Sequence, residues 1–484
     1  MEFGSTFVHA ITIISIIFVI FIERKNPQTT IAWVLVMLIL PGLGTFIYLM
    51  VGTSGALSYF FRRRLRTSSR FTEDYARLLY EQLDSDFRQL SQLPEHLSRF
   101  LDIIRMHLNQ SGSLLTTNNQ VELFVDMREH YEDLLTTLSQ AKHHINIEYF
   151  IIQNDTIGRR LLEVLCQKAE EGVQVRLLYD AFGTIKTRFS FFEPLIKRGG
   201  KVQRFYGTFW ANLLSLNHRD HRKIVVIDGE IAYTGGANIG DEYMGKHPVV
   251  KPWRDTAVKL HGGIVSMLQL RFLLDWSMWD PHDLSFDDPA TFEFFFPDVP
   301  CDGTICAQIV SSGPDTGGEA IRDGYVKMIN NARRTLYLQT PYFIPDEPLL
   351  QALRIAATSG VDVRVMIPGV PDKSFVYAIT LSYVSELLRS GIRVYLHEGF
   401  IHSKMMVMDD LCATIGTSNF DIRSFSLNFE VNAFFYDEDF STQCKEVFLD
   451  DAKRSLELTE EEFSRRGLLV RMFESVCRLL AYLS

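Results

Sequence analysis

The chain has 484 residues, 46% of them hydrophobic, and a net charge of −10. This size and composition exclude a largely disordered chain and allow about two to four domains. The acidic balance argues against a protein that coats nucleic acid. Six dispersed cysteines without a C-x-x-C pair argue against a disulfide framework or a zinc site and fit a reducing compartment.

Two apolar stretches open the chain. Residues 7–22 are apolar except for three polar side chains, and residues 31–51 are apolar again after a short polar loop. Because a bilayer core needs about 20 apolar residues, residues 1–55 are predicted to form a transmembrane hairpin of two helices. The alternatives are a secretory signal peptide, disfavoured by the absence of Lys or Arg before the first stretch, a buried soluble hairpin, and a re-entrant hairpin.

Residues 56–111 are predicted to form a basic and helical bridge. It begins with five arginines, at Arg62, Arg63, Arg64, Arg66 and Arg70. Arginines directly after an apolar span favour the cytoplasmic side of a membrane and attract anionic lipid head groups. The alternative is a solvated run of charge. Arg24 and Lys25 in the loop between the two stretches also favour the cytoplasm, which leaves the topology open.

The remaining chain repeats itself. A β-rich run at 141–151 has a counterpart at 332–344, and each run is followed by a helical pattern that ends in glycine, at Gly172 and Gly360. An apolar strand comes next in both copies. Strand–helix–strand units with apolar strands predict a parallel arrangement with helical crossovers. We therefore expect an α/β protein of two pseudo-symmetric lobes, 112–290 and 301–455, each with a central mixed or parallel sheet, joined by a linker at 291–300.

Each lobe carries the same polar motif. The first copy runs from His221 and Lys223 through Asp228 to a glycine-rich turn, and the second copy repeats this spacing from His402 and Lys404 through Asp409. The two turns contain Gly235, Gly236 and Asn238 in the first copy, and Gly416, Thr417, Ser418 and Asn419 in the second.

The spacing of the histidine and lysine in each motif has a physical explanation. A histidine and a lysine two residues apart on a strand point to the same face, and glycine lets the backbone approach a ligand closely. Two such faces offer two histidines, two ammonium groups and two amides around one anion. A phosphodiester fits this set, because one histidine can attack phosphorus while the other protonates the leaving alkoxide. The residues of both turns are therefore candidates for substrate binding.

The doubled motif resembles the signature of the phospholipase D superfamily, H-x-K-x4-D-x6-G-[GST]-x-N. Further segments look like the bacterial cardiolipin synthases of this superfamily: Glu23–Gln28, Pro41–Gly44, Trp253–Asp255 and Ile415–Ser424. The resemblance covers the chain from about Phe7 onward. It implies transfer of a phosphatidyl group between two phosphatidylglycerol molecules, giving cardiolipin and glycerol through a phosphatidyl-histidine intermediate.

The resemblance also implies roles for the motif residues. His221 is expected to be the nucleophile and His402 the general acid and base, although the pseudo-symmetry leaves the reverse assignment open. Lys223 and Lys404, with the two asparagines, are expected to hold the phosphoryl oxygens. No metal or cofactor is expected, since the lysines supply the positive charge.

Four carboxylates complete the set of candidate catalytic residues. A histidine that reacts at one ring nitrogen needs the other nitrogen held, usually by a carboxylate. Glu430 is the candidate for His402, and Asp255 is its counterpart for His221; an ordinary strand or surface position is the alternative for both. Asp228 and Asp409 belong to the motif, but the pattern favours an architectural role for them.

Two apolar features lie outside the motifs. The first lobe has an insertion before His221 that contains Phe205, Tyr206, Phe209, Trp210, Leu213 and Leu214. It is interpreted as a lip for acyl chains or as a loop that covers the core. Residues 456–484 show an apolar stripe flanked by arginines, which predicts an amphipathic C-terminal helix that lies at a membrane surface; the alternative is a helix packed on the lobes.

The sequence thus favours a multi-pass enzyme of the bacterial cell membrane with cytoplasmic lobes. Its expected partners are phosphatidylglycerol and anionic membrane lipids, with no nucleic acid; the sequence leaves homo-oligomerisation open. The nearest alternative is a membrane-bound phospholipase D that uses water or another alcohol as acceptor. A nuclease of the same superfamily and a non-catalytic membrane scaffold are further alternatives, disfavoured by the hairpin and by the two intact motifs.

Overall fold

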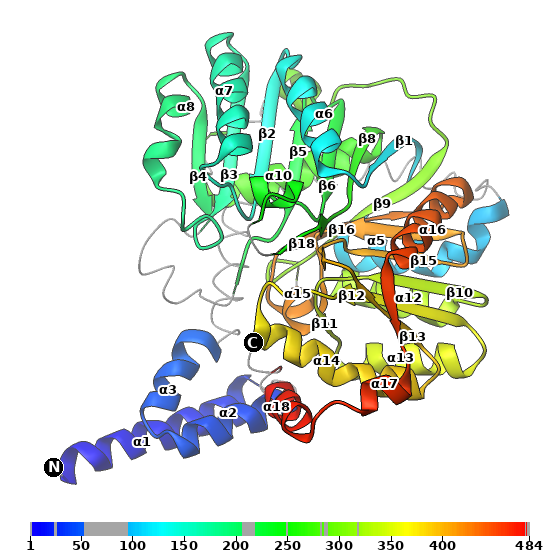
Figure 1. Ribbon diagram of the computed structural model, residues 1–484. Helices are drawn as coiled ribbons and strands as arrows, with labels where there is room; N and C mark the ends of the chain where they lie inside the picture. Colours follow the sequence, from blue (N-terminus) through cyan, green and yellow to red (C-terminus); the bar gives the residue numbers. More distant parts are fainter. Residues whose placement is uncertain are drawn as a thin grey trace.

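The computed structural model describes residues 2–23, 27–52, 95–205, 218–247, 250–280, 283–284, 289–316, 319–479 and 481. The N-terminal helices project from one end of a large α/β body, with α2 (Pro27–Ile39) beside α18 (Leu468–Leu479) (Figure 1). The predicted arginine run at 62–70 and most of the predicted bridge lie outside the described residues.

The body is built on one mixed sheet of 15 strands in the order β19-β13-β12-β10-β15-β16-β18-β9-β1-β8-β6-β5-β2-β3-β4. The strands of the first half are β1 (Thr116–Phe124), β2 (His144–Tyr149), β3 (Gln174–Asp180), β4 (Lys201–Phe205), β5 (Lys223–Ile227), β6 (Ile231–Gly235) and β8 (Ala257–Gly262). Those of the second half are β9 (Ile305–Ser312), β10 (Thr335–Gln339), β12 (Asp362–Pro368), β13 (Arg393–His397), β15 (Met405–Met408), β16 (Cys412–Gly416), β18 (Glu430–Phe435) and β19 (Ser455–Leu458).

The expectation of a separate sheet in each lobe is wrong. β1 and β9 pair antiparallel and join the two halves into a continuous sheet (Figure 1). An unpaired β1 or β9 would leave a row of backbone groups without partners at the lobe interface, and this pairing satisfies them. The predicted parallel units are present on each side, since β2, β3 and β4 run parallel, as do β10, β12 and β13.

Helices cover both faces of the sheet. In the first half they are α6 (Met127–Ser139), α7 (Thr156–Glu170), α8 (Glu193–Lys197) and α10 (Ile264–Trp279), with short 3-10 turns η5 (Phe189–Phe191) and η6 (Asp241–Met244). In the second half they are α12 (Ala320–Asn331), α13 (Glu347–Thr358), α14 (Ser374–Arg389), α15 (Ile422–Ser426), α16 (Glu438–Lys453), α17 (Glu460–Ser464) and α18 (Leu468–Leu479).

The repeated crossover helices begin and end for the same reasons in both halves. Asp155 caps α7 by accepting a hydrogen bond from the Gly158 N–H, and Asp346 caps α13 in the same way. Both helices are followed by a glycine with positive φ, 91° at Gly172 and 96° at Gly360. The predicted glycine stops are therefore confirmed as left-handed C′ positions.

Two connecting segments pack more closely than their sequences suggest. α5 (Leu101–Ser111), preceded by the 3-10 turn η4 (Glu95–Phe100), buries Ile103 and Ile104 in the core of the second half. α11 (Pro289–Phe295), at the start of the predicted linker, returns to the first half, where the rings of Phe294 and Phe295 lie about 5 Å from the ring of His144.

Among the described residues, one helix is long and apolar enough to cross a membrane, by length and composition. It covers Thr6–Glu23, which belong to α1 and its continuation η1. The N-terminal elements are α1 (Glu2–Phe18) continued by η1 (Val19–Glu23), α2 (Pro27–Ile39), α3 (Leu43–Ile47) and η2 (Tyr48–Gly52). The second predicted span is thus not a continuous helix. It breaks after Ile39, because Pro41 lacks an N–H and Gly42 takes a positive φ of 79°. The Thr12 and Thr45 hydroxyls, 3.1 Å apart, join α1 to α3 across this turn.

Candidate active site

The two histidine motifs meet at the interface between the halves. Each histidine lies just before a central strand and is held by backbone of the opposite half. The N–H of His221 donates to the carbonyl of Phe429 at 2.9 Å, and that of His402 donates to the carbonyl of Arg254 at 2.7 Å. Short parallel pairing of β7 (Trp253–Arg254) with β14 (Phe400–Ile401) extends the second contact.

Each carboxylate binds the histidine of the opposite half. Both Glu430 oxygens lie within 3.0 Å of the Nδ1 atom of His221, and Asp255 Oδ2 lies 2.6 Å from Nδ1 of His402. Both candidates do hold histidines, but the predicted pairing within each half is wrong. The backbone contacts explain the crossing, because Glu430 follows Phe429 and Asp255 follows Arg254, the two residues that bind the opposite histidines.

The glycine-rich turns allow this close approach. A methyl group at Gly236 would lie 2.1 Å from Asp255 Oδ1 and 3.0 Å from the carbonyl oxygen of His402. At Gly416 it would lie 2.3 Å from the side-chain oxygen of Asn432. The glycines therefore make room for neighbouring protein groups, a role that sequence reasoning did not foresee. Gly235 is equally enclosed, with the Thr256 carbonyl 2.5 Å from an added methyl.

Thr417 and Ser418 also form hydrogen bonds to protein groups. The Thr417 hydroxyl donates to Glu430 Oε2 at 2.5 Å, and Asn428 donates to Oε1 at 3.2 Å. The Ser418 N–H donates to Asn432 and its hydroxyl donates to the carbonyl of Asn419. Glu430 is thus held by two side chains besides His221. Neither Thr417 nor Asn428 was singled out as a support for a carboxylate.

Both lysines are buried, each with 1% of its surface exposed. Lys223 Nζ donates to the carbonyl of His221 at 2.8 Å, and Lys404 Nζ binds the carbonyl of His402 in the same way. Burial lowers the pKa of Lys223 to about 8 and that of Lys404 to about 7. A bound anion would reverse this effect, because an opposite charge favours the ammonium form.

Both motif histidines are neutral rings at physiological pH. Burial lowers the pKa of His221 to about 4 and that of His402 to about 3, and the neighbouring lysines act in the same direction. Burial alone would raise the pKa of Glu430 and Asp255, but the facing histidines and lysines outweigh it, so both carboxyls titrate below their usual range. Each ionised carboxylate fixes the proton on Nδ1 and leaves Nε2 for reaction.

Aromatic rings enclose the two imidazoles. The ring of Phe150 lies 5.0 Å from that of His221, and the rings of Trp253 and Phe400 lie 5.4 and 5.8 Å from that of His402. Phe150 and Phe400 carried no sequence signal beyond their closeness to apolar strands, and they were not predicted as site residues.

The two asparagines differ in their surroundings. Asn238 Oδ1 accepts the N–H of Ile151 at 3.3 Å, and its amide donates to the Tyr243 hydroxyl at 2.8 Å. The Oδ1 atom of Asn419 is buried and has no hydrogen-bond partner within the described part of the chain. Tyr243 is a further residue of the site that sequence reasoning missed.

Asp228 and Asp409 lie at the far ends of the motif strands and do not join the histidines. Asp228 accepts hydrogen bonds from three consecutive backbone N–H groups, at Lys142, His143 and His144, between 2.7 and 2.9 Å. Asp409 does the same for Arg333, Arg334 and Thr335. Their inclusion among the catalytic candidates is therefore wrong, and the architectural alternative fits, since each anchors the start of the adjacent strand.

The predicted apolar lip is described only at Phe205. This residue is fully buried in the core, with its ring 5.0 Å from that of Trp279 and 4.9 Å from that of Phe429. Phe205 therefore supports the core rather than a lip. Tyr206, Phe209, Trp210, Leu213 and Leu214 lie outside the described residues.

Replacing Asp228 by alanine is expected to lower the free energy of unfolding by about 2–4 kcal/mol, because three backbone N–H groups, of which that of His144 is buried, lose a charged acceptor. Asp228→Asn keeps one acceptor oxygen and should cost less. Glu230→Ala, at an exposed position in the same turn, is the matched control and should stay within about 0.5 kcal/mol. Denaturant unfolding measures the difference; an Asp228→Ala protein of unchanged stability would contradict the anchoring role.

Comparisons with known proteins agree with this geometry. The family model described as "Cardiolipin synthase, PLD-like domain" matches residues 134–247 and 325–452, one segment in each half. A second model, described as "Phospholipase_D-nuclease N-terminal", matches residues 10–52.

Similar proteins match along nearly the whole chain. The major cardiolipin synthase ClsA of Bacillus subtilis (strain 168) is 43% identical over 474 residues, covering 97% of each chain. The cardiolipin synthase of Listeria innocua serovar 6a is 40% identical over 465 residues, covering 96% of this chain and 95% of that protein. The crystal structure of phosphatidylserine synthase from Haemophilus influenzae Rd KW20 shares the fold, with a TM-score of 0.59 and 16% identity over 78% of this chain and 98% of that one.

Three observations agree. Both halves carry the motif, the family model matches one segment in each half, and the relatives match along nearly the whole chain. The chain belongs to the family of cardiolipin synthases with phospholipase D-like domains.

Proposed function

We propose that the chain is a cardiolipin synthase that transfers a phosphatidyl group from one phosphatidylglycerol molecule to another and releases glycerol. The observation that carries the proposal is the pair of buried histidines, each with Nδ1 held by a carboxylate and Nε2 left for chemistry. The names of the relatives supply the lipid, because the geometry itself specifies only a phosphodiester.

In the first step, Nε2 of His221 attacks the phosphorus of the donor lipid. A P–N bond forms, the P–O bond to glycerol breaks, and His402 gives a proton to the departing glycerol oxygen. In the second step, the head-group hydroxyl of another phosphatidylglycerol attacks the same phosphorus. His402 takes the hydroxyl proton, the P–N bond breaks, and cardiolipin leaves with both histidines restored.

The lowered pKa values suit the first half of this cycle. A neutral His221 is a ready nucleophile, and Lys223 and Lys404 offer charge to the phosphoryl oxygens. His402 must be protonated before it acts as an acid. The negative phosphodiester, added to Asp255, raises the pKa of His402 when substrate binds.

The asparagines are proposed to complete the oxyanion contacts. The amide of Asn419 is the better placed to turn toward a substrate, because its oxygen has no protein partner among the described residues. Asn238 already donates to Tyr243 and has one amide hydrogen left for a phosphoryl oxygen.

Purified full-length protein given phosphatidylglycerol is expected to produce cardiolipin and glycerol, with lipids resolved by mass spectrometry. His221→Ala and His402→Ala should each lower turnover by about 10²–10⁴-fold, because each removes a reacting group. His143→Ala, at an exposed histidine of the same half, is the matched control and should retain turnover. Formation of phosphatidic acid without cardiolipin would instead identify a phospholipase D and contradict the proposal.

We further propose that the chain is a multi-pass protein of the bacterial cell membrane, with its catalytic body cytoplasmic and a hairpin of α1 and the shorter α2–α3 segment in the bilayer. α1 is the span supported by length and hydropathy. The α2–α3 segment can contribute only if the bilayer accommodates its turn at Pro41, which neighbouring helices make tolerable.

α18 is proposed to rest on the same membrane. It packs on α14, buries Cys477 and leaves a row of large apolar side chains exposed: Leu468, Leu469, Val470, Met472, Phe473, Val476 and Leu479. α18 lies next to α2 (Figure 1), and residues of both helices line a cavity of about 830 Å³. An apolar face beside a predicted span, flanked by Arg471 and Arg478, fits an anionic lipid surface.

A polarity-sensitive fluorophore on Phe473→Cys is expected to be quenched by spin-labelled lipid in reconstituted vesicles. The same fluorophore on Lys453→Cys, an exposed position of α16, is the matched control and should not be quenched. Equal quenching at the two positions, or none at Phe473→Cys, would contradict the placement of α18 at the membrane.

A further inference from the structure

The cavity of about 830 Å³ between the N-terminal segment and the second half of the body has walls of opposite character. α2 forms one wall, and α14 and α18 form the other (Figure 1). No residue of the doubled motif lines this α2–α18 cavity. The proposed transfer therefore leaves it without a role.

The wall that α2 contributes is apolar. Ile31, Leu35 and Ile39 follow one another at intervals of four residues, so they share one face of the helix. Each lines the cavity and is more than half exposed. Ala32 and Val36 complete this wall. The space beside α2 therefore suits an apolar occupant.

The wall that α14 and α18 contribute is basic. Two carboxylates line the cavity, those of Glu347 and Glu474, and they are outnumbered by four arginines: Arg389, Arg466, Arg471 and Arg478. The side of the cavity that faces α2 therefore suits an anionic occupant.

Ion pairs neutralise these arginines to different extents. Arg466 binds both oxygens of Glu474, at 2.5 and 2.9 Å, so its charge is matched. Arg478 lies 3.2 Å from Glu386, which also accepts Arg354 at 3.1 Å. Two guanidinium groups thus share the charge of one carboxylate.

Two further arginines keep their charge available to a ligand. Arg389 lies 3.6 Å from Glu460 in an exposed pair, which contributes little. Arg471 is exposed and forms no ion pair with any residue that the structure describes. When the outer residues Glu386, Glu460 and Arg354 are included, five arginines face four carboxylates around the cavity.

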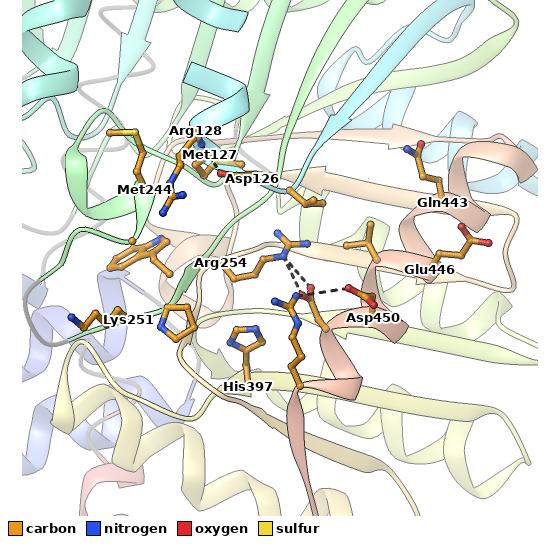
Figure 2. A pocket seen from close by; sticks show the side chains of 17 residues that line it. Asp126, Met127, Arg128, Met244, Lys251, Arg254, His397, Gln443, Glu446 and Asp450 are labelled. Carbon is orange, nitrogen blue, oxygen red and sulfur yellow. Dashed lines mark hydrogen bonds and ion pairs between the residues drawn. The ribbon is translucent and has the colours of Figure 1, made fainter. Parts of the chain in front are cut away.

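The larger cavity, of about 880 Å³ between the two halves, has no such excess of charge (Figure 2). Four basic side chains line it, among them Lys251, together with four acidic ones, among them Asp450. An apolar wall opposite a basic wall is therefore particular to the α2–α18 cavity.

We infer that an anionic phospholipid occupies the α2–α18 cavity, with its phosphate at Arg389 and Arg471 and an acyl chain along the apolar wall of α2. Direct packing of α2 on the arginines would bury charge without partners, and water alone would leave the apolar face wet. An anionic lipid satisfies both walls, because guanidinium groups bind phosphate oxygens and the chain covers the helix. The inference rests on the proposed placement of the N-terminal helices in the membrane, which supplies the lipid.

Photo-crosslinking of the full-length protein in phosphatidylcholine vesicles tests the inference. The probes are phosphatidylglycerol and phosphatidylcholine, each with a diazirine in one acyl chain, and His221→Ala prevents conversion of the first probe to cardiolipin. Mass spectrometry identifies the labelled peptides. The anionic probe should label the cavity face of α2 at least about fivefold more than the zwitterionic probe, the effect expected of one basic residue at an anionic surface. Both probes should label α1 alike.

Variants of the two walls locate the bound lipid. Arg471→Gln should lower the preference for the anionic probe at α2 about fivefold, and Arg389→Gln should lower it in the same direction. Ala32→Phe, which places a ring in the cavity, should lower labelling of α2 without a change of charge. Arg465→Gln is the matched control, because it removes the same charge from an exposed arginine outside the cavity.

Equal labelling of α2 by the two probes would overturn the inference, and so would an Arg465→Gln protein that loses the preference as fully as Arg471→Gln. Labelled α1 in these cases would leave the membrane placement standing. Absence of label from α1 would contradict that placement and the inference with it.

Discussion

Two imidazole–carboxylate pairs, His221 with Glu430 and His402 with Asp255, hold the proposed reaction centre together. Each joins a histidine of one half to a carboxylate of the other, so neither half contains a complete catalytic unit. β1 and β9 pair antiparallel and hold the two halves in one continuous sheet, across which these pairs form. The glycines of the motif turns serve this contact, since a larger residue at Gly236 would displace Asp255.

The crossed histidine–carboxylate pairs also help determine which groups of the site are charged. Four ionisable motif residues and two carboxylates are buried at one interface, where burial disfavours every charge. The carboxylates stay ionised because histidines and lysines face them, while the imidazoles stay neutral because burial and the lysines oppose protonation. An incoming phosphodiester changes this balance at once, which links substrate binding to the protonation of His402.

Much of this architecture could be predicted from the sequence. The doubled spacing located His221, Lys223, His402 and Lys404, and the glycines after the crossover helices marked real helix ends. The motif placed Asp228 and Asp409 among the catalytic candidates, although the pattern favoured an architectural role for both. Each has three backbone donors that lie 74 to 86 residues away in the chain, a contact that no local pattern reveals.

The pairing of carboxylates with histidines could not be predicted for the same reason. Spacing along the chain placed Glu430 nearest His402, whereas the backbone contacts of Phe429 and Arg254 carry each carboxylate across the interface. The second apolar stretch had the composition of a span, but the turn at Pro41 and Gly42 divides it.

The crossed pairing is tested most directly with phosphatidyl-p-nitrophenol, whose leaving group departs without a proton. Release of nitrophenolate in the first turnover then depends on the nucleophile and its carboxylate, and not on His402, which is needed again only to complete the second step. The account predicts that Glu430→Gln slows release at least about 100-fold, as His221→Ala does, while Asp255→Asn and His402→Ala leave it largely intact. Glu430→Gln behaving like His402→Ala, and Asp255→Asn like His221→Ala, would contradict it.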